Sequence, residues 1–323
     1  MSRALALLLL VALAALGAHL PGRAAGEGGA EPEERALSRA FARAVDAGAR
    51  HLVAIRPASD GARRRARSGV IVAPDLVATC VSNVDAFGLD DLVVEDGAGR
   101  VLPATLRGRD LRLRVVLLRV PDLGAPAPEL AAGARRLGSF VLALGSVLGG
   151  PLAPTASQGI VSVTGRFEGR ADQLDAPLDR SNWGGPVVDL EGRLAGVSVY
   201  VDERLGERSG VGFAVPVPRI LAVLERLAQG DQLEAGWLGV VIPRHDDGEG
   251  PGVAIRAVLP GSSAAAAGVE TGDRVVGLAG RPVPHRRAFR EVAADLYAGQ
   301  KVELEVLRGG APRRLELVLA PRR

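Results

Sequence analysis

Short apolar runs separated by turn residues make up the middle of the sequence, and this pattern restricts the fold more than any other feature. Between residues 51 and 217, each run is only a few residues long and is bounded by Gly, Pro or Asp. The 323-residue chain contains 42 Gly and 21 Pro, which fits many tight turns. Such spacing is typical of strands in an all-β sandwich or a pair of barrels. The expected strands are 52–55, 69–72, 92–94, 115–120, 140–144, 159–163, 187–190 and 194–199.

Helical patterns flank this β region. Residues 33–47 and 218–228 place apolar side chains at helical spacing. The segment 230–236, which begins and ends with Gly, is expected to act as a hinge. We therefore expect one domain at 36–229, preceded by a polar linker at 25–35.

A second, smaller domain is expected at 237–323. Its sequence has strand patterns at 252–258, 274–278 and 302–308, and a helical pattern at 287–297. A segment of this size is large enough to fold as a compact unit.

The N-terminus has the three-part pattern of an export signal. Residues 1–3 carry a positive charge, residues 4–16 form an unbroken apolar run, and small residues follow near Ala24. The run is short for a membrane span, which needs about 20 apolar residues. We expect a cleaved signal peptide at 1–24 and a periplasmic or secreted protein, with an uncleaved membrane anchor as the alternative.

Charge and cysteine content exclude several classes of function. The formal net charge is +3, and two of the cations, Arg3 and Arg23, lie in the export segment, so the mature charge is about +1. This small charge does not indicate nucleic-acid binding. The single cysteine, Cys80, excludes an intramolecular disulfide and a cysteine-based zinc cluster. No cofactor or metal is expected.

Five glycine-containing segments follow one another along the chain, at 68–75, 158–162, 184–192, 210–216 and 236–240. In this order and at these intervals they resemble the HtrA/Deg family of exported trypsin-like serine proteases that carry a C-terminal PDZ domain. The resemblance extends over nearly the whole mature chain. It implies a mainly β protein: a trypsin-like double six-stranded β-barrel followed by a PDZ domain, itself a β-sandwich with short helices.

The positions that carry catalysis in this family hold other residues here. The family uses a serine nucleophile, a histidine base and an aspartate that orients the base. The three family motifs that contain these residues align with residues 79–84, 114–120 and 181–186 of this chain. Ser82 stands at the histidine, Arg114 at the aspartate, Trp183 at the serine and Ser181 at an oxyanion-hole glycine.

None of these substitutes can perform the replaced chemistry. No histidine occurs between His51 and His245, and the hydroxyl of Ser82 is not basic near neutral pH. Trp183 has no nucleophilic atom, and Arg114 reverses the charge of the orienting group. The sequence therefore predicts a pseudoprotease without catalytic residues.

Other routes to catalysis or metal binding have weak support. The only lysine, Lys301, lies outside the β region, which excludes a serine–lysine pair there. Cys80 is expected to be a small buried thiol, and His51 a surface or packing residue. His245 precedes two aspartates but is expected to belong to an ordinary loop. A serine endopeptidase that uses unrecognised residues remains the alternative.

The C-terminal domain retains the features needed to bind peptides. Segments at 252–255, 258–264, 267–276 and 280–283 resemble a bacterial PDZ domain. PDZ domains add a peptide C-terminus to a sheet edge and hold its carboxylate with backbone amides of a glycine-containing loop. The expected peptide-binding residues are Trp237, Leu238, Gly239, Val240, Val292 and Leu296.

The predicted function is binding without cleavage. We expect C-terminal peptides or unfolded proteins as ligands, with an apolar terminal side chain, and a role as adaptor, decoy or chaperone-like factor in envelope protein quality control. Homologous active proteases are expected partners, and the family resemblance implies that a homotrimer could form. Nucleic acid is not expected, and a membrane only if the signal stays uncleaved. A purely structural envelope protein is a third hypothesis.

Overall fold

The computed structural model describes seven segments of the chain, and the contacts between Cα atoms divide the chain into two units, 1–39 and 40–323. The predicted signal peptide and most of the predicted linker lie outside the described residues. Helix α2 (Glu33–Ala49) begins within the predicted linker, so the helix starts earlier than the expected domain boundary. The described segments are 33–59, 66–88, 91–131, 136–146, 153–201, 210–245 and 250–321.

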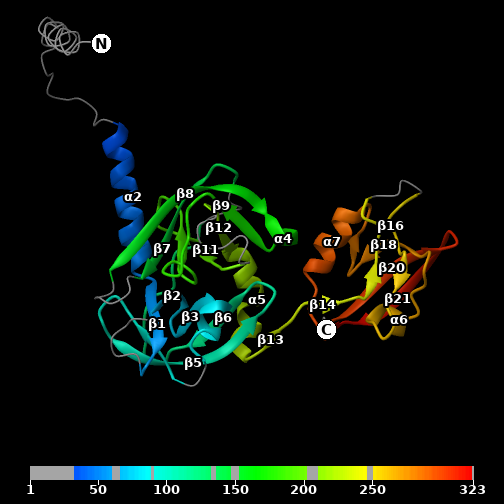
Figure 1. Cartoon of the computed structure of the whole chain (residues 1–323), viewed down its shortest axis with the longest axis horizontal. Coiled ribbons are helices and arrows are strands. Elements are labelled where there is room, and N and C mark those ends of the chain that lie inside the picture. The colour runs from blue at the N-terminus through cyan, green and yellow to red at the C-terminus, as the bar shows by residue number, and fades with distance from the viewer. Residues whose placement is uncertain are drawn as a thin grey trace, which may run out of the picture. The chain divides into compact units, whose positions relative to one another are not determined.

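The first six strands form an antiparallel barrel. Their order is β5-β4-β1-β2-β3-β6, and pairing between β5 and β6 closes the sheet (Figure 1). Buried aliphatic side chains such as Val53, Ile71 and Leu118 fill its interior. The strands are β1 (Leu52–Pro57), β2 (Arg67–Ala73), β3 (Leu76–Cys80), β4 (Leu92–Glu95), β5 (Val101–Asp110) and β6 (Val115–Arg119).

The next six strands form a second closed barrel with the order β10-β11-β12-β9-β8-β7. Val70 and Leu117 of the first barrel share one hydrophobic cluster with Val197 and Val215 of the second. The trypsin-like double barrel predicted from the sequence is thus confirmed. The strands are β7 (Phe140–Ser146), β8 (Pro154–Gly165), β9 (Ala171–Leu174), β10 (Pro186–Val188), β11 (Leu194–Ser198) and β12 (Gly212–Pro216).

Three of the described helices follow strands of the barrels. The short helix α3 (Val81–Asp85) follows β3, and the single turn α4 (Arg166–Gly169) joins β8 to β9. Helix α5 (Val217–Gln229) buries Ile220 and Leu227 against the shared cluster.

The segment predicted as a hinge is partly fixed to the first barrel. Gly230 ends helix α5 in the left-handed conformation, with φ 105°. Strand β13 (Gln232–Leu233) then pairs in parallel with β5, and Leu233 is buried in the shared cluster. These contacts hold Leu233 against the first barrel, and a hinge within 230–236 stays a prediction.

The C-terminal domain has a small sheet of strands β16, β18, β20 and β21, with β19 paired to β18. Helices α6 (Ser263–Ala266) and α7 (Arg286–Ala294) pack on its apolar core. Two further pairs, β14 with β22 and β15 with β17, complete the domain. The strands are β14 (Gly236–Trp237), β15 (Val240–Val241), β16 (Val253–Ala254), β17 (Ala257–Val258), β18 (Arg274–Leu278), β19 (Arg281–Pro282), β20 (Lys301–Arg308), β21 (Ala311–Val318) and β22 (Ala320–Pro321).

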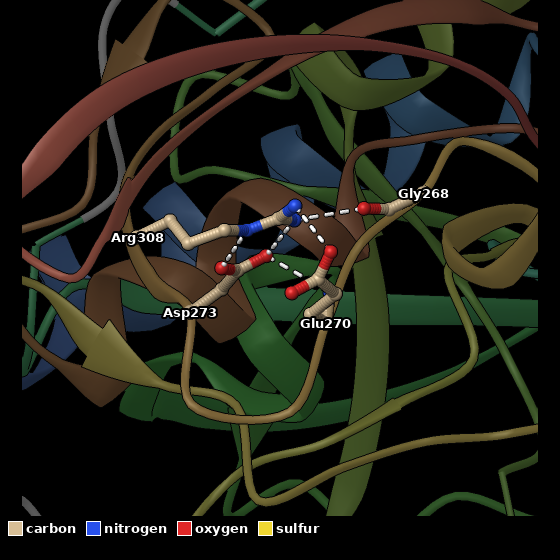
Figure 2. A network of polar contacts seen from close by, with 4 residues as sticks. All are labelled: Gly268, Glu270, Asp273 and Arg308. Carbon is tan, nitrogen blue, oxygen red and sulfur yellow. Dashed lines mark hydrogen bonds and ion pairs between the residues drawn. The ribbon is translucent and has the colours of Figure 1, made fainter.

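A buried carboxylate stabilises one turn of this domain. Figure 2 shows Asp273 facing the guanidinium of Arg308, whose Nε donates to Asp273 Oδ1 at 2.8 Å. The same guanidinium donates to the carbonyl of Gly268 at 2.8 Å, and the amide of Glu270 donates to Asp273 Oδ2 at 2.9 Å. Burial alone would raise the pKa of Asp273, but the bonds from Arg308 and the Glu270 amide outweigh it and lower that pKa.

Tyr297 connects the C-terminal domain to the barrels. Its hydroxyl donates to Asp110 Oδ2 at 2.6 Å, and its ring belongs to the cluster shared by the two barrels. The guanidinium of Arg112 lies over the ring, 3.8 Å from its centroid. Burial, followed by the charge of Asp110 and the hydrogen bond to it, raises the pKa of this phenol far above its ordinary value.

Candidate functional site

The structure brings together the three positions that the resemblance marks as catalytic. The side-chain amide of Asn83, next to Ser82, donates to the carbonyl of Trp183 at 2.6 Å. On the other side of Ser82, the amide of Val81 donates to the carbonyl of Arg114 at 2.9 Å. These two hydrogen bonds therefore hold the three segments side by side at the junction of the barrels.

In the loop that contains Trp183, two backbone amides donate hydrogen bonds to acceptors within the same loop. The amide of Ser181 donates to Asp179 Oδ1 at 2.7 Å, and the amide of Trp183 donates to the carbonyl of Asp179 at 3.1 Å. In a trypsin-like protease, free amides near the nucleophile stabilise the oxyanion. Here both amides at the expected positions already have acceptors within the loop.

The indole of Trp183 is part of the packing at this junction. The centroids of the indole and of the Tyr200 ring are 4.6 Å apart, and the two ring planes make an angle of 47°. It also packs against the cluster shared by the barrels and against the core of the second barrel. The side chain therefore fills space beside the loop.

Two glycines that follow Trp183 are required by close backbone packing. Gly184 has φ +84°, and a Cβ at this position would lie 2.2 Å from Thr79 Oγ1. A Cβ at Gly185 would lie 2.2 Å from the carbonyl oxygen of Leu144. These clashes explain both glycines by geometry and need no catalytic role.

Ser82 has a thiol as its neighbour. The Oγ of Ser82 lies 3.1 Å from Cys80 Sγ, and burial raises the pKa of the Cys80 thiol above its ordinary value. A thiol with a raised pKa is a poor nucleophile.

The histidines lie in other parts of the fold. His51 precedes β1 and is half-buried, and its burial, with the charge of Arg50, lowers its pKa. The Nδ1 of His285 accepts the amide of Ala288 at 3.1 Å and so caps helix α7. His245 is described, but the two aspartates that follow it lie outside the described residues. In the described part of the chain, no group of three or more His, Cys, Asp or Glu side chains could hold a metal.

A groove of about 270 Å³ lies beside the loop predicted to bind peptides. Its lining includes all four residues of the segment from Trp237 to Val240. Gly239 has φ +78°, and a Cβ there would lie 2.0 Å from the Cβ of Ser262. Among the described residues, β15 pairs only with β17, so its second edge is open to another strand.

The helix residues that line the groove differ from those predicted. Val292 and Leu296 are buried in the core of the domain, and α7 ends at Ala294, before Leu296. Phe289 and Ala293 line the groove instead. The expected helix extended three residues beyond the observed end at Ala294, and a role of Val292 and Leu296 in peptide binding stays a prediction.

Charged residues from the barrel region also line this groove, which the sequence analysis missed. They are Arg112, Glu168 and Arg170. Arg290 of α7, a further lining residue, donates to Glu168 Oε1 at 2.5 Å. No periodicity in the sequence indicates a contact between segments so far apart.

Two domain families match the chain. The trypsin-like peptidase domain family matches residues 67–197, and the PDZ domain family matches residues 236–319. The peptidase match covers strands of both barrels, and the PDZ match begins at the groove.

Curated relatives include periplasmic proteases. The chain is 31% identical over 266 residues to a probable periplasmic serine endoprotease DegP-like from Pseudomonas fluorescens, which aligns with 78% of this chain and 55% of that protein. It is 29% identical over 259 residues to the periplasmic serine endoprotease DegP of Escherichia coli K12, covering 75% of this chain and 54% of that protein. The chain therefore spans about half the length of the curated relatives it matches.

Solved structures of similar size have the same fold. A serine endoprotease from Yersinia pestis superposes with a TM-score of 0.68 at 25% identity and covers 88% of this chain and 98% of its own. The HtrA-type protease AlgW, solved with a tripeptide, gives a TM-score of 0.70 at 26% identity, covering 88% and 97%.

The double barrel and the groove define a protein that joins a trypsin-like peptidase fold to a PDZ domain. The domain matches, the relatives and the solved structures show that the chain is similar to HtrA-type and DegP-type proteases in both of these parts. In the described residues, no helix is both long enough and apolar enough to cross a bilayer.

Proposed function

We propose that this chain is an exported pseudoprotease that binds the C-termini of peptides or unfolded proteins without cleaving them. The observation that carries the proposal is the use of the loop amides at Ser181 and Trp183 by Asp179. Acyl transfer needs free donors for the oxyanion as well as a nucleophile and a base. At the positions that the family resemblance assigns to them, this chain offers Ser82, Arg114 and Trp183.

The binding half of the proposal is supported by the C-terminal domain. The groove combines a glycine-containing loop at Gly239, an open strand edge at β15 and a partly apolar wall that includes Phe289. These are the elements by which PDZ domains bind a peptide C-terminus. The structure of AlgW with a tripeptide adds support from a relative.

The competing function is that of an active serine endoprotease with unrecognised catalytic residues. It is favoured by the names of the curated relatives, which are serine endoproteases, and by the peptidase fold itself. The two functions differ in one measurable property, the cleavage of an unfolded protein.

A cleavage assay on denatured casein separates them. The purified chain is incubated with casein alongside an active DegP-type protease as the positive control. We expect intact casein with this chain, and no labelling by a serine-reactive fluorophosphonate. Cleavage that the fluorophosphonate inhibits would establish the endoprotease instead.

A peptide assay tests binding separately. Peptides that end in valine are offered with a free carboxylate and as the matched C-terminal amides. We expect the amide to bind at least about tenfold more weakly, because the loop amides then lose a charged acceptor. Equal binding of the two forms would argue against recognition of the C-terminus and favour the structural hypothesis.

The cellular role follows from this binding. We propose action in the periplasm or outside the cell, as an adaptor, decoy or chaperone-like factor in envelope protein quality control. The periplasmic names of the relatives support the location. Homologous active proteases are proposed partners, and assembly into a homotrimer is proposed by analogy with the family.

A further inference from the structure

A second cavity of about 270 Å³ lies next to the segment that precedes β6. Part of its wall is made by core residues that are at most 3% exposed, namely Leu113, Val199 and Val215. Three arginines also line it. We call this cavity the arginine pocket and define it by Arg112, Arg114, Arg170, Leu113, Val199 and Val215.

Positive charge in the arginine pocket is not balanced by its own lining. Arg170 pairs with Glu168 at 3.0 Å, but Arg114 is exposed, and its guanidinium has no hydrogen bond or ion pair among the described residues. The described residues of the lining include no carboxylate. An apolar wall beside uncompensated cations favours a ligand that is apolar and negatively charged.

Arg112 adds donors that lack an acceptor. Its Nε and Nη1 are buried and have no hydrogen-bond partner among the described residues. The nearby carboxylate of Asp110 is already engaged, because Oδ1 accepts the amides of Arg112 and Leu113 and Oδ2 accepts the hydroxyl of Tyr297. Buried polar groups normally have hydrogen-bond partners. The two unpartnered donors of Arg112 therefore indicate that a ligand could supply the acceptor.

The size of the cavity limits what can fill it. A volume of about 270 Å³ lies below the ordinary range of about 300–1,000 Å³ for small-molecule pockets. It therefore fits one short apolar chain with a polar end group and not an extended peptide strand. Guanidinium groups bind carboxylates with paired, charge-assisted hydrogen bonds.

We propose that the arginine pocket binds a monocarboxylate that carries a short apolar chain. Arg112 and Arg114 hold the carboxylate, and Leu113, Val199 and Val215 contact the apolar chain. The ligand thus brings a carboxylate beside Arg114, where the family resemblance places the orienting aspartate. This chemistry belongs both to a free short-chain carboxylic acid and to the last residue of a peptide. The site does not depend on peptide binding by the C-terminal domain.

Calorimetry on the full chain tests the proposal with octanoate as the probe and octanamide as its neutral counterpart. We expect octanoate to bind at least about tenfold more tightly, because only the carboxylate can pair with both arginines. Binding of octanamide with equal affinity, or no binding of octanoate at millimolar concentration, would overturn the proposal.

A matched pair of variants locates the site. Arg114→Gln removes a cation from the pocket, whereas Arg119→Gln removes an exposed cation from β6, five positions along the chain and outside the lining. We expect the first to weaken octanoate binding about tenfold and the second to leave it unchanged. Both variants are checked for folding by circular dichroism. Equal effects of the two, or no effect of Arg114→Gln, would contradict the proposal.

A third arm identifies the source of the carboxylate. N-acetyl-Ala-Val is compared with its C-terminal amide in the wild-type chain and in Arg114→Gln. Dipeptide binding that weakens in Arg114→Gln identifies peptide ends as ligands of the arginine pocket. Binding of octanoate alone identifies free carboxylic acids, and both results support the site. If Arg114→Gln changes the binding of neither the dipeptide nor octanoate, both ligands bind at other surfaces. This result would overturn the proposed site.

Discussion

At the scale of single residues, the proposal of a pseudoprotease rests on the backbone of the loop as well as on side chains. The family resemblance predicts that Trp183, Ser82 and Arg114 stand at the catalytic positions. The engagement of the Ser181 and Trp183 amides by Asp179 was not predictable in the same way, because an acceptor within a loop depends on local dihedral angles. The sequence indicated only that a glycine is missing at Ser181.

Restoring the three side chains is therefore expected to be insufficient for catalysis. The variant with Ser82→His, Arg114→Asp and Trp183→Ser should leave casein intact, because the loop amides remain bonded to Asp179. Removing a single oxyanion donor already costs about 10²–10³ in rate. Adding Asp179→Ala, which removes the carboxylate acceptor of the residue-181 amide, and Ser181→Gly, which lets the loop backbone rearrange, should give more cleavage than the three changes alone. Full activity in the threefold variant would show that the loop opens without help.

At the scale of secondary structure, strands with a continuous apolar run were predictable, whereas strand β5 was not. Runs such as 52–55 and 194–199 correspond to β1 and β11 because every residue in them is buried. Strand β5 alternates exposed and buried residues, contains a proline and has an irregular register near Gly108, so no apolar run marks it. The end of α7 was missed because Leu296 continues the apolar spacing after the helix has stopped.

The turn around Asp273 gives a prediction on pH. Because the folded pKa of Asp273 is lowered, its contribution to stability is complete above the unfolded pKa of about 3.9 and is lost as the pH falls through the folded value. Asp273→Asn should lower the free energy of unfolding by about 2–3 kcal/mol at pH 7. It should have a smaller effect at pH 2–3, measured by thermal unfolding.

The control for this experiment is an exposed ion pair on the same domain. Arg314 lies 3.2 Å from Glu305 and is largely exposed, so Arg314→Gln should change stability by less than about 1 kcal/mol at either pH. An effect of Asp273→Asn that is as small as the control, or independent of pH, would contradict the role given to this network.

At the scale of the whole molecule, the contact between the C-terminal domain and the barrels was the least predictable feature. The sequence placed a hinge at 230–236, but Leu233 and Tyr297 are both buried in the cluster shared by the barrels. Residues from distant segments meet there, and local patterns of polarity contain no information about such pairs. The order of the domains, in contrast, followed directly from the motifs.

Removal of one hydroxyl should weaken this contact. Tyr297→Phe leaves Asp110 Oδ2 without its donor and should lower the free energy of unfolding by about 1–3 kcal/mol. It should also increase limited proteolysis within 230–236, because the domain is held less firmly. Arg290→Gln serves as the control, since its exposed pair with Glu168 is worth less than about 1 kcal/mol. Proteolysis of Tyr297→Phe at the wild-type rate would contradict a fixed junction.

The central claim, binding without cleavage, is tested most directly in a single sample. The full chain is mixed with a fluorescent peptide that ends in a free carboxylate; anisotropy reports binding, and mass spectrometry after prolonged incubation reports the integrity of the peptide. The account predicts a saturable rise in anisotropy and a peptide that remains intact. Cleavage fragments whose formation is blocked by a serine-protease inhibitor would contradict it.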